Sequence, residues 1–390
     1  MPEGVLHGIR VADFSRVLAG PYATMLLADF GADVIKIEPP AGDDTREWKP
    51  PVDASGEATY FGSVNRNKRS VALDLATDAG LADARRLAET ADVVIENFRP
   101  GVMARFGLAY DDIRAANPGV VFCSITGFGA GAGAGLAGYD LLVQAVGGLM
   151  SITGDPGGEP AKAGVALVDV ITGQNAVAGI LLALRERDRT GRGQRVEVNL
   201  LQGLLSALTN QAGSTLATGR APKRMGNQHP SIAPYAVFRA ADRELVIAVG
   251  NDRQFRTLVR LIGRETLGDD DRFATNPARV AHRDELGAEL EAVLTTRPAT
   301  EWAGIFADAG VPAGLVHDVA EAIAFAESLG LDPVVDLDGR RSVADPIGLS
   351  ATPPVYRTPP PALDEHAGAD WLHAADRLDP AGRHHRKDPE

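Results

Sequence analysis

Asp169 is the side chain of greatest chemical interest in this sequence. It is the only acidic residue between Glu159 and Glu186, and it lies in an apolar run that a Thr-Gly pair follows. We interpret Val165–Val170 as a buried strand that ends where a helix begins. A carboxylate at that point can cap the helix, or it can act as a partly desolvated nucleophile or base at the carboxyl edge of a sheet. From the residues alone, both roles stay open.

A cluster of positive charge is the second candidate site. Residues 58–73 contain Arg66, Lys68 and Arg69 and no acidic residue, although the whole chain has a net charge of −13. We call Asn65–Ser70 the cationic segment. Three cations and two asparagines at the edge of an expected strand could bind a polyanion such as a phosphate-bearing ligand. A solvated loop between two elements explains the same residues, so this alternative also stays open.

Composition limits the class of protein. With 390 residues, of which 45% are hydrophobic and 23% charged, the chain is expected to form two folded domains of ordinary size. The net charge of −13 argues against general binding to nucleic acid or to anionic membranes. Neither a signal peptide nor an apolar run of about 20 residues is evident. We therefore expect a cytoplasmic protein that does not enter a membrane.

The usual signatures of bound cofactors are missing from the sequence. The single cysteine, Cys123, excludes an intramolecular disulfide and is expected to pack in the core. The eight histidines have no metal-ligand spacing, and the first turn, Arg16–Pro21, matches neither a GxGxxG nor a P-loop pattern. We expect neither a metal nor a nicotinamide or flavin cofactor.

The pattern of elements predicts an α/β protein, with a doubly wound, Rossmann-like large domain and a smaller α+β domain. Strand-like runs alternate with helical ones in the first third, which is typical of a parallel sheet with crossover helices. Strands are expected over 9–14, 33–38, 71–75, 92–97, 120–126, 165–170, 195–200 and 245–249. Helices are expected over 20–32, 78–90, 172–187, 253–262, 283–294 and 301–309, with Leu181, Leu182 and Leu184 on the buried side of the third.

Changes in composition suggest the domain boundaries. A stretch rich in Gly, Pro and polar residues predicts a linker over 218–234, between a large domain over 1–217 and a small domain over 235–328. Pro346–Pro361 is extended and proline-rich, which suits a segment that crosses another surface. We therefore expect residues 329–390 to return to the large domain.

Eight short motifs follow one another along the first 230 residues. They are Arg16–Pro21, Asp33–Glu38, Asn65–Ser70, Glu96–Gly101, Ser124–Gly129, Gly138–Asp140, Asp169 with Thr172–Gly173, and Gly226–Pro230. Each is weakly specific alone, but the ordered set closely resembles the class III CoA-transferases, the family that includes formyl-CoA transferase and α-methylacyl-CoA racemase. The resemblance implies CoA or acyl-CoA as a substrate, no metal, and an interlocked homodimer.

The resemblance also implies roles for individual residues. The Asp169 carboxylate would attack the thioester carbonyl of an acyl-CoA donor to form a mixed anhydride, which the CoA thiolate converts into an enzyme–CoA thioester. The acceptor acid would then take CoA by the reverse sequence. The implied CoA contacts are Val17, Ala19, Lys68, Arg69, Asn97, Phe98 and Arg105. Candidate contacts for the small carboxylic acid are Tyr139, Arg46 and His229.

Two activities and one non-catalytic role fit this resemblance. The racemase branch pairs the aspartate with the histidine of a Gly-His-Asp motif, but this chain has Tyr139 at that position. A phenol, with a pKa of about 10, replaces imidazole poorly near neutral pH, so CoA transfer is favoured over racemisation of a 2-methylacyl-CoA. A non-catalytic acyl-CoA-binding protein would keep the cationic segment without needing Asp169. Within the transferases, Gly42–Arg46 and Val249–Phe255 are most similar to the succinyl-CoA-dependent dicarboxylate branch.

Overall fold

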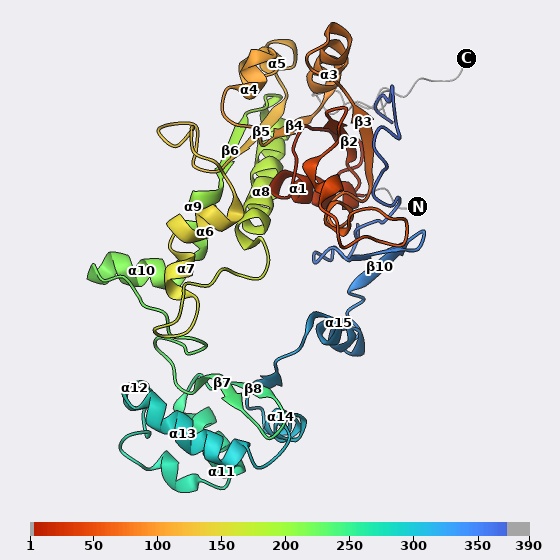
Figure 1. The fold of residues 1–390 in the computed structure, drawn as a ribbon. Helices are drawn as coiled ribbons and strands as arrows, with labels where there is room; N and C mark the ends of the chain where they lie inside the picture. Colours follow the sequence, from red (N-terminus) through yellow and green to blue (C-terminus); the bar gives the residue numbers. More distant parts are fainter. Residues whose placement is uncertain (1–3, 373–390) are drawn as a thin grey trace. The chain divides into compact units, whose positions relative to one another are not determined.

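The computed structural model describes residues 4–372, and these form two compact units (Figure 1). The first unit contains residues 4–149, 162–219 and 332–372, and the second contains residues 150–161 and 220–331. The predicted large domain, 1–217, includes residues 150–161, which here pack with the second unit. Residues 373–390, the end of the predicted returning segment, lie outside the described residues.

A six-stranded parallel sheet forms the centre of the first unit, in the order β3-β2-β1-β4-β5-β6. The strands are β1 (Arg10–Asp13), β2 (Asp33–Glu38), β3 (Lys68–Ala72), β4 (Val93–Glu96), β5 (Val121–Thr126) and β6 (Arg195–Asn199). The strand order reverses between β1 and β4. In open α/β sheets, ligands bind outside the carboxyl ends of the strands at such a switch point.

Helices cover both faces of this sheet. The helices of the unit are α1 (Ala19–Asp29), α2 (Thr59–Gly62), α3 (Asp78–Thr90), α4 (Val102–Arg105), α5 (Tyr110–Ala116), α6 (Asp140–Val146), α8 (Leu167–Thr190), α9 (Leu200–Ala207) and α10 (Thr209–Thr218). Because strand side chains alternate between faces, Val11 and Cys123 join a core with α1 and α8, whereas their neighbours Ala12 and Phe122 join a core with α3 and α5.

The start of α8 differs from the sequence prediction. The predicted strand over 165–170 is wrong, since the helix begins at Leu167 and places Asp169 in its first turn. Periodicity alone cannot distinguish a short apolar strand from the first turn of a buried helix. The predicted burial of Leu181 and Leu182 is also wrong, because these side chains are 41% and 73% exposed, whereas Leu184 is buried.

By length and apolar composition, α8 is the one helix within residues 4–372 that could cross a membrane. Core helices of soluble proteins meet the same criteria, so this is weak evidence for a membrane span. In the first unit, α8 packs against α1, β5 and β6.

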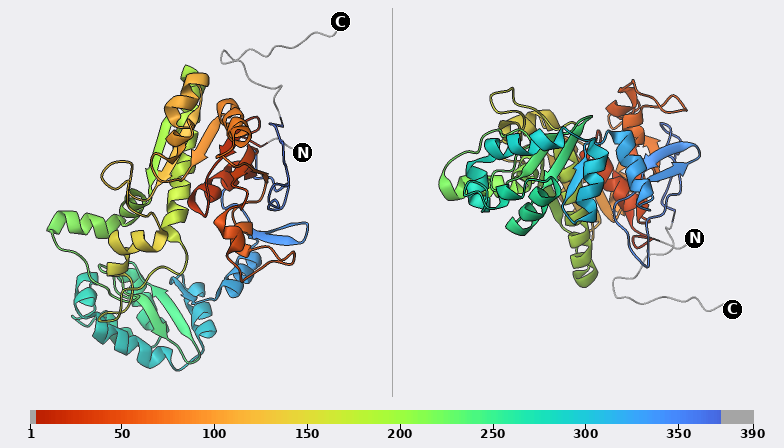
Figure 2. Two further views of the ribbon diagram at one scale, coloured as in Figure 1. Left: turned by 45° about the horizontal axis from the view of Figure 1, so that its top comes forward. Right: turned by 90° about the horizontal axis from the view of Figure 1, so that it is seen from below.

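The chain beyond β11 (Arg340–Val343), which pairs with β10 (Val334–Leu337), belongs to the first unit. Figure 2 shows this C-terminal segment, in blue, beside the red N-terminal part of the unit. The backbone N–H of Val355 donates to the carbonyl oxygen of Asp29 at 2.7 Å, and Trp371 is buried in the core that contains α3. Residues 332–372 therefore complete the first unit.

The second unit is built around a three-stranded antiparallel sheet in the order β7-β8-β9. Its elements are β7 (Tyr235–Arg239), β8 (Glu244–Ala248), α11 (Asp252–Leu261), α12 (Asn276–Ala281), α13 (Arg283–Leu294), α14 (Ala299–Asp308), β9 (Ala313–Leu315) and α15 (Val319–Ser328). A separate apolar core, which includes Phe255, Leu290 and Phe306, holds the sheet and helices together. The short helix α7 (Leu149–Ile152) lies where the chain first passes from one unit to the other.

Candidate active site

The first turn of α8 lies at the carboxyl edge of the parallel sheet. Gly173 packs so closely on α1 that a Cβ atom there would lie 2.7 Å from the carbonyl oxygen of Ala19, just after the β1 turn. At the other end of α8, Arg187 pairs with Asp92 at 3.0 Å, next to the amino end of β4. The helix thus runs antiparallel to the strands. Asp169, one turn before Gly173, is therefore near the edge where this architecture binds ligands.

Asp140, the first residue of α6, caps α8 from outside the helix. Its Oδ1 accepts hydrogen bonds from the backbone N–H groups of Val168 at 2.8 Å and Asp169 at 3.3 Å. Its Oδ2 accepts a hydrogen bond from Gln144 Nε2 at 2.6 Å, and Gln144 Oε1 accepts from the N–H of Ala163. Asp140 therefore has the capping role that the sequence left open for Asp169.

The Asp169 carboxylate has neither a hydrogen bond nor an ion pair with any other residue in 4–372. Burial, and then the negative charge of Asp140, raise the pKa of Asp169 to about 7. A partly desolvated carboxylate without a partner retains its lone pairs for attack on a carbonyl carbon, and near neutral pH a large fraction is ionised. A strongly raised pKa at a ligand-binding edge is typical of a functional group rather than a structural one.

An apolar cluster flanks Asp169 and includes a tyrosine that the sequence analysis missed. Val17, Tyr60, Ala166 and Val170 pack in this cluster, so residues on both sides of Asp169 in the chain contact it. Burial, followed by the charges of Asp169 and Asp140, raises the pKa of Tyr60 to about 12. The phenol therefore stays protonated near neutral pH. An isolated tyrosine in an uncharged run has no sequence signal, and only the fold places it here.

A pocket of about 300 Å³ opens beside the turns that follow β1, β2, β3 and β4. Its walls include residues 14–16, 36–40, 42–44 and 73–76, together with Phe98, Val102 and Phe106. Of the predicted CoA contacts, Phe98 lines this pocket. The exposed Arg105 is on α4 with the lining residue Val102 and directly precedes the lining residue Phe106. Leu73, Phe98 and Phe106 are among the apolar residues that line the pocket.

The cations of the cationic segment are already paired. Lys68 Nζ has no exposed surface and contacts Asp13 at 3.2 Å, Asn65 Oδ1 at 2.8 Å and the carbonyl oxygen of Pro21 at 2.9 Å. Arg66 pairs with Asp29 at 2.6 Å, and Arg69 pairs with Asp33 at 2.8 Å. The predicted strand over 71–75 in fact spans Lys68–Ala72, which draws two of the cations into the sheet. Lys68 and Arg69 would have to give up these partners to reach a phosphate.

The cationic segment also anchors the C-terminal part of the first unit. Asn67 Oδ1 accepts hydrogen bonds from the backbone N–H groups of Arg357 and Thr358, at 2.7 and 3.1 Å. Arg66 donates to the hydroxyl oxygen of Ser342 at 2.7 Å. These bonds give the segment a structural task that its composition did not reveal.

The candidate contacts for a carboxylic acid are scattered. Arg46 is buried, pairs with Glu38 at 2.7 Å and stacks on Phe61. Tyr139 precedes the capping Asp140 and is 68% exposed. His229 belongs to the second unit, where its Nδ1 accepts a hydrogen bond from the N–H of Ser231. Within the first unit, the fold thus groups Val17 with Asp169 and Phe98 with Arg105.

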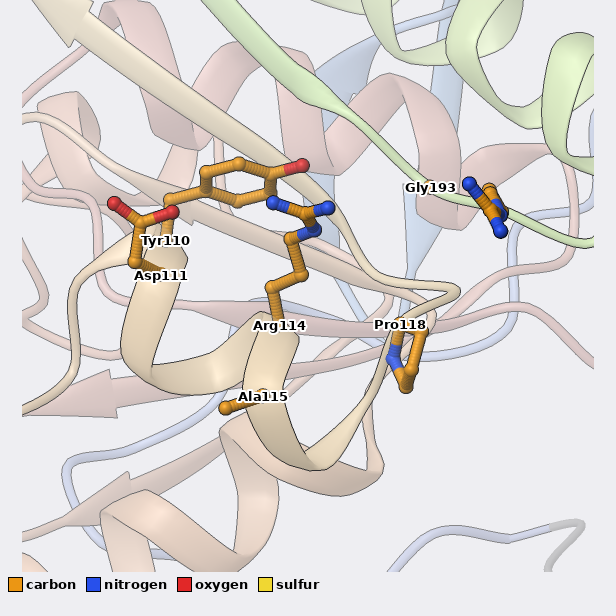
Figure 3. Close-up of a pocket in the computed structure, with 7 residues that line it drawn as sticks. Tyr110, Asp111, Arg114, Ala115, Pro118 and Gly193 are labelled. Carbon is orange, nitrogen blue, oxygen red and sulfur yellow. The ribbon is translucent and has the colours of Figure 1, made fainter.

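A second pocket, of about 500 Å³, lies at the opposite edge of the sheet (Figure 3). Figure 3 shows Tyr110 and Arg114 of α5 on one side, and Pro118 and Gly193, which precede β5 and β6, on the other. Amino ends of parallel strands are not where this architecture binds substrates. The charged lining residues Asp111, Arg114 and Arg192 are all exposed, so we do not assign chemistry to this pocket.

Other reactive groups in the described residues do not form a site. Cys123 is fully buried on β5, and burial raises the pKa of its thiol, so the reactive thiolate is disfavoured. Within residues 4–372, no three His, Cys, Asp or Glu side chains are grouped so that they could hold a metal ion.

The comparisons with known proteins agree with the fold and with the family that the sequence resembles. Residues 6–367 match the profile of "CoA-transferase family III". The chain is 45% identical over 373 residues to the "Succinate--glutarate CoA-transferase" of Agrobacterium fabrum, and this match covers 93% of both chains. It is 40% identical to the "Acetyl-CoA:oxalate CoA-transferase" of Acetobacter aceti, over 94% of this chain and 95% of that one.

A solved structure gives the same result. The crystal structure of a CAIB/BAIF family protein from Brucella suis is 44% identical, with a TM-score of 0.86, and the match covers 94% of this chain and 98% of that one. The chain therefore belongs to CoA-transferase family III, and the prediction of a class III CoA-transferase is confirmed.

Proposed function

We propose that this protein moves CoA from a dicarboxylic acyl-CoA to a free carboxylic acid through covalent intermediates on Asp169. The observation that carries the proposal is the unpaired Asp169 carboxylate, with a pKa raised to about 7, at the carboxyl edge of the sheet. The names of the relatives, which include a succinate–glutarate and an acetyl-CoA–oxalate enzyme, support dicarboxylic substrates.

The first half-reaction forms an anhydride and then a thioester. An Asp169 oxygen attacks the thioester carbonyl carbon of the donor, the C–S bond breaks, and CoA leaves as a thiolate. The thiolate then attacks the Asp169 carbonyl carbon, which releases the donor acid as a carboxylate and leaves CoA on the enzyme. Covalent catalysis of this kind keeps the free energy of the thioester, provided that water is excluded.

The second half-reaction runs these steps in reverse with the acceptor. The acceptor carboxylate attacks the Asp169 thioester carbonyl, and CoA leaves as a thiolate while a new mixed anhydride forms. The thiolate attacks the acceptor's carbonyl carbon, which gives the new acyl-CoA and restores the Asp169 carboxylate. No net proton is consumed, so the aspartate needs no partner acid or base, in agreement with its lack of one.

The pocket at the switch point is the proposed site for the nucleotide end of CoA. The apolar lining residues Phe98, Phe106 and Leu73 suit contact with an adenine ring, and the exposed Arg105 suits a phosphate. Val17 and Ala19 would contact the arm that leads to Asp169. The strand order β3-β2-β1-β4-β5-β6 supports a Rossmann-like description of this unit.

We further propose that the protein works as a homodimer in the cytoplasm. Leu142 on α6, Leu182 on α8, Leu205 on α9 and Leu216 on α10 are all exposed. Apolar side chains on neighbouring helices favour a partner surface, and the family resemblance suggests a second copy of the chain. Light scattering tests this: a mass of two chains is expected, and a mass of one chain at micromolar concentration contradicts it.

Trapping the intermediate tests the proposed function. The protein is incubated with succinyl-CoA and no acceptor, then treated with borohydride or hydroxylamine, and the peptides are analysed by mass spectrometry. We expect a reduced or hydroxamate product at Asp169 alone. Asp169→Ala should give no adduct while CoA binding, measured by calorimetry, is largely retained. An adduct elsewhere, or transfer by the variant at the wild-type rate, contradicts the proposal.

A further inference from the structure

The turn between β1 and α1 is held by a buried ion pair. Lys36 Nζ donates to the carbonyl oxygen of Ser15 and to Asp43 Oδ2, in both cases at 2.9 Å. The backbone N–H of Val17 is shared between the two Asp43 carboxylate oxygens at 3.2 and 3.3 Å. The side chains of Lys36 and Asp43 are only 0% and 1% exposed. The pair thus fixes a carbonyl group and an N–H group that lie two residues apart in the turn.

Asn97 holds the residue between them. Its Oδ1 accepts a hydrogen bond from the N–H of Arg16 at 2.9 Å, and its Nδ2 donates to the carbonyl oxygen of Arg16 at 2.7 Å. Both the oxygen and the nitrogen of the Asn97 side-chain amide are therefore hydrogen-bonded to the backbone of Arg16. Because Asn97 follows β4, this contact joins the two turns on either side of the switch point.

The backbone conformation of Val17 is energetically unfavourable for this residue type. Val17 has a φ of +69°, in the left-handed region that β-branched residues strongly disfavour. Strained residues of this kind persist only where surrounding contacts enforce them, and they concentrate at functional sites. Here the strained residue packs in the apolar cluster with Tyr60, Ala166 and Val170, beside Asp169.

The Lys36–Asp43 ion pair stays charged near neutral pH. Burial opposes the charge on Asp43, but Lys36 and the hydrogen bonds from Thr45 outweigh it and hold the pKa of Asp43 at about 2. Burial also opposes the charge on Lys36, but Asp43 and Asp13 outweigh it and raise the pKa of Lys36. Buried ion pairs often add little net stability compared with apolar residues of the same size, so fixed geometry is a better reason for this one.

We propose that Lys36, Asp43 and Asn97 are positioning residues for CoA transfer, and that they act by holding residues 15–17 as one wall of the Asp169 site. This inference rests on the proposed function. It changes the role expected for Asn97, which the family resemblance suggests as a direct CoA contact. A positioning residue acts on the rate of the chemical step, whereas a contact with a remote part of CoA acts on its binding.

Steady-state kinetics of the full-length Asn97→Ala and Asp43→Asn variants test the proposal. Small displacements of a catalytic site can cost about 100-fold in rate, so we expect kcat to fall about 100-fold for Asp43→Asn and about 10-fold for Asn97→Ala. Asp43 borders the pocket proposed for the nucleotide, but its carboxylate oxygens already accept hydrogen bonds from Lys36 and from the N–H groups of Val17 and Thr45. KM for acyl-CoA should therefore change less than about threefold. If kcat is unchanged in folded protein and KM rises instead, these are binding residues and the proposal is wrong.

A second substitution separates positioning from general stability. Glycine adopts a positive φ without strain, so Val17→Gly should make the turn less dependent on Asp43. We expect Asp43→Asn to lower kcat at least about tenfold less in the Val17→Gly background than in the wild type. Equal losses in both backgrounds contradict the proposal. If Asp43→Asn does not fold, the uncharged and half-buried Asn97→Ala takes its place in the same pair of backgrounds.

Asp92→Asn is the matched control. Asp92 is also a largely buried, ion-paired carboxylate of the first unit, but it pairs with Arg10 and Arg187 at the other edge of the sheet. Its variant should lose thermal stability and keep kcat in the folded protein. Adduct formation at Asp169 in the wild type is scored separately. No adduct rejects the proposed function, whereas an adduct together with normal kcat in the variants rejects only the positioning role.

Discussion

The cationic segment and the first turn of α8 differ in whether their charged side chains are paired. In the segment, Arg66, Lys68 and Arg69 each pair with a carboxylate within 3.2 Å. The side chains of Arg66 and Lys68 are almost completely buried, and that of Arg69 is 15% exposed. At the start of α8, the Asp169 carboxylate meets no cation within the described residues and faces the like charge of Asp140. The difference teaches that a compensated charge holds the fold, whereas a charge left uncompensated at a binding edge is available for chemistry.

The comparison predicts the largest effect for removal of a paired charge. Lys68→Met leaves Asp13 buried beside an apolar side chain, and breaking a buried pair in this way costs about 3–5 kcal/mol of stability. Because Lys68 Nζ is enclosed, the folded variant should bind acyl-CoA with an unchanged KM. Urea unfolding gives the stability, and kinetics well below the melting temperature give KM.

Arg105→Met is the matched variant, since its guanidinium is exposed. We expect its stability to stay within about 0.5 kcal/mol of the wild type. Its KM for acyl-CoA should rise about tenfold, as for the loss of one charge-assisted hydrogen bond. If Lys68→Met instead weakens CoA binding at full stability, the cationic segment is a phosphate site and the comparison fails.

The sequence predicted the α/β class and the approximate position of each strand in the parallel sheet. The reactive role of Asp169 came from the family resemblance and stays a prediction. The sequence did not predict how charges pair, because pairing depends on strand register: Arg69 lies opposite Ile35 in the sheet, yet its partner is Asp33. It also misassigned the strand over 165–170, since the cap that starts α8 comes from Asp140, distant in sequence. Long-range contacts of this kind leave no local pattern.

The comparison predicts that neutralising Asp169 stabilises the protein. Its pKa rises from an ordinary value of 3.8 to about 7 on folding, so between these values the folded state binds more protons than the unfolded state. Wild-type stability therefore falls as the pH rises through that window. At pH 8, Asp169→Asn should be more stable by about 1–3 kcal/mol, after allowance for solvent at this partly exposed site.

The two variants should therefore change stability in opposite directions: Lys68→Met is less stable than the wild type, and Asp169→Asn is more stable. Thermal melts at pH 4 provide the internal control, because wild-type Asp169 is mostly protonated in the folded state there and the gain should almost vanish. A destabilised Asp169→Asn at pH 8 contradicts the claim that the carboxylate lacks partners.

The smallest predicted effect concerns the pH at which Asp169 becomes reactive. Only its carboxylate form attacks a thioester, so kcat/KM for acyl-CoA should fall about tenfold per pH unit below a midpoint near 7. Asp140→Asn removes the neighbouring negative charge and keeps an oxygen to accept the N–H of Val168, so the midpoint should move below 7. Its new amide would face the Nε2 donor of Gln144, so a melting temperature must accompany the profile. A midpoint that stays in place in a stable variant would mean that burial alone sets the reactivity of Asp169, and that Asp140 acts on α8 only as its cap.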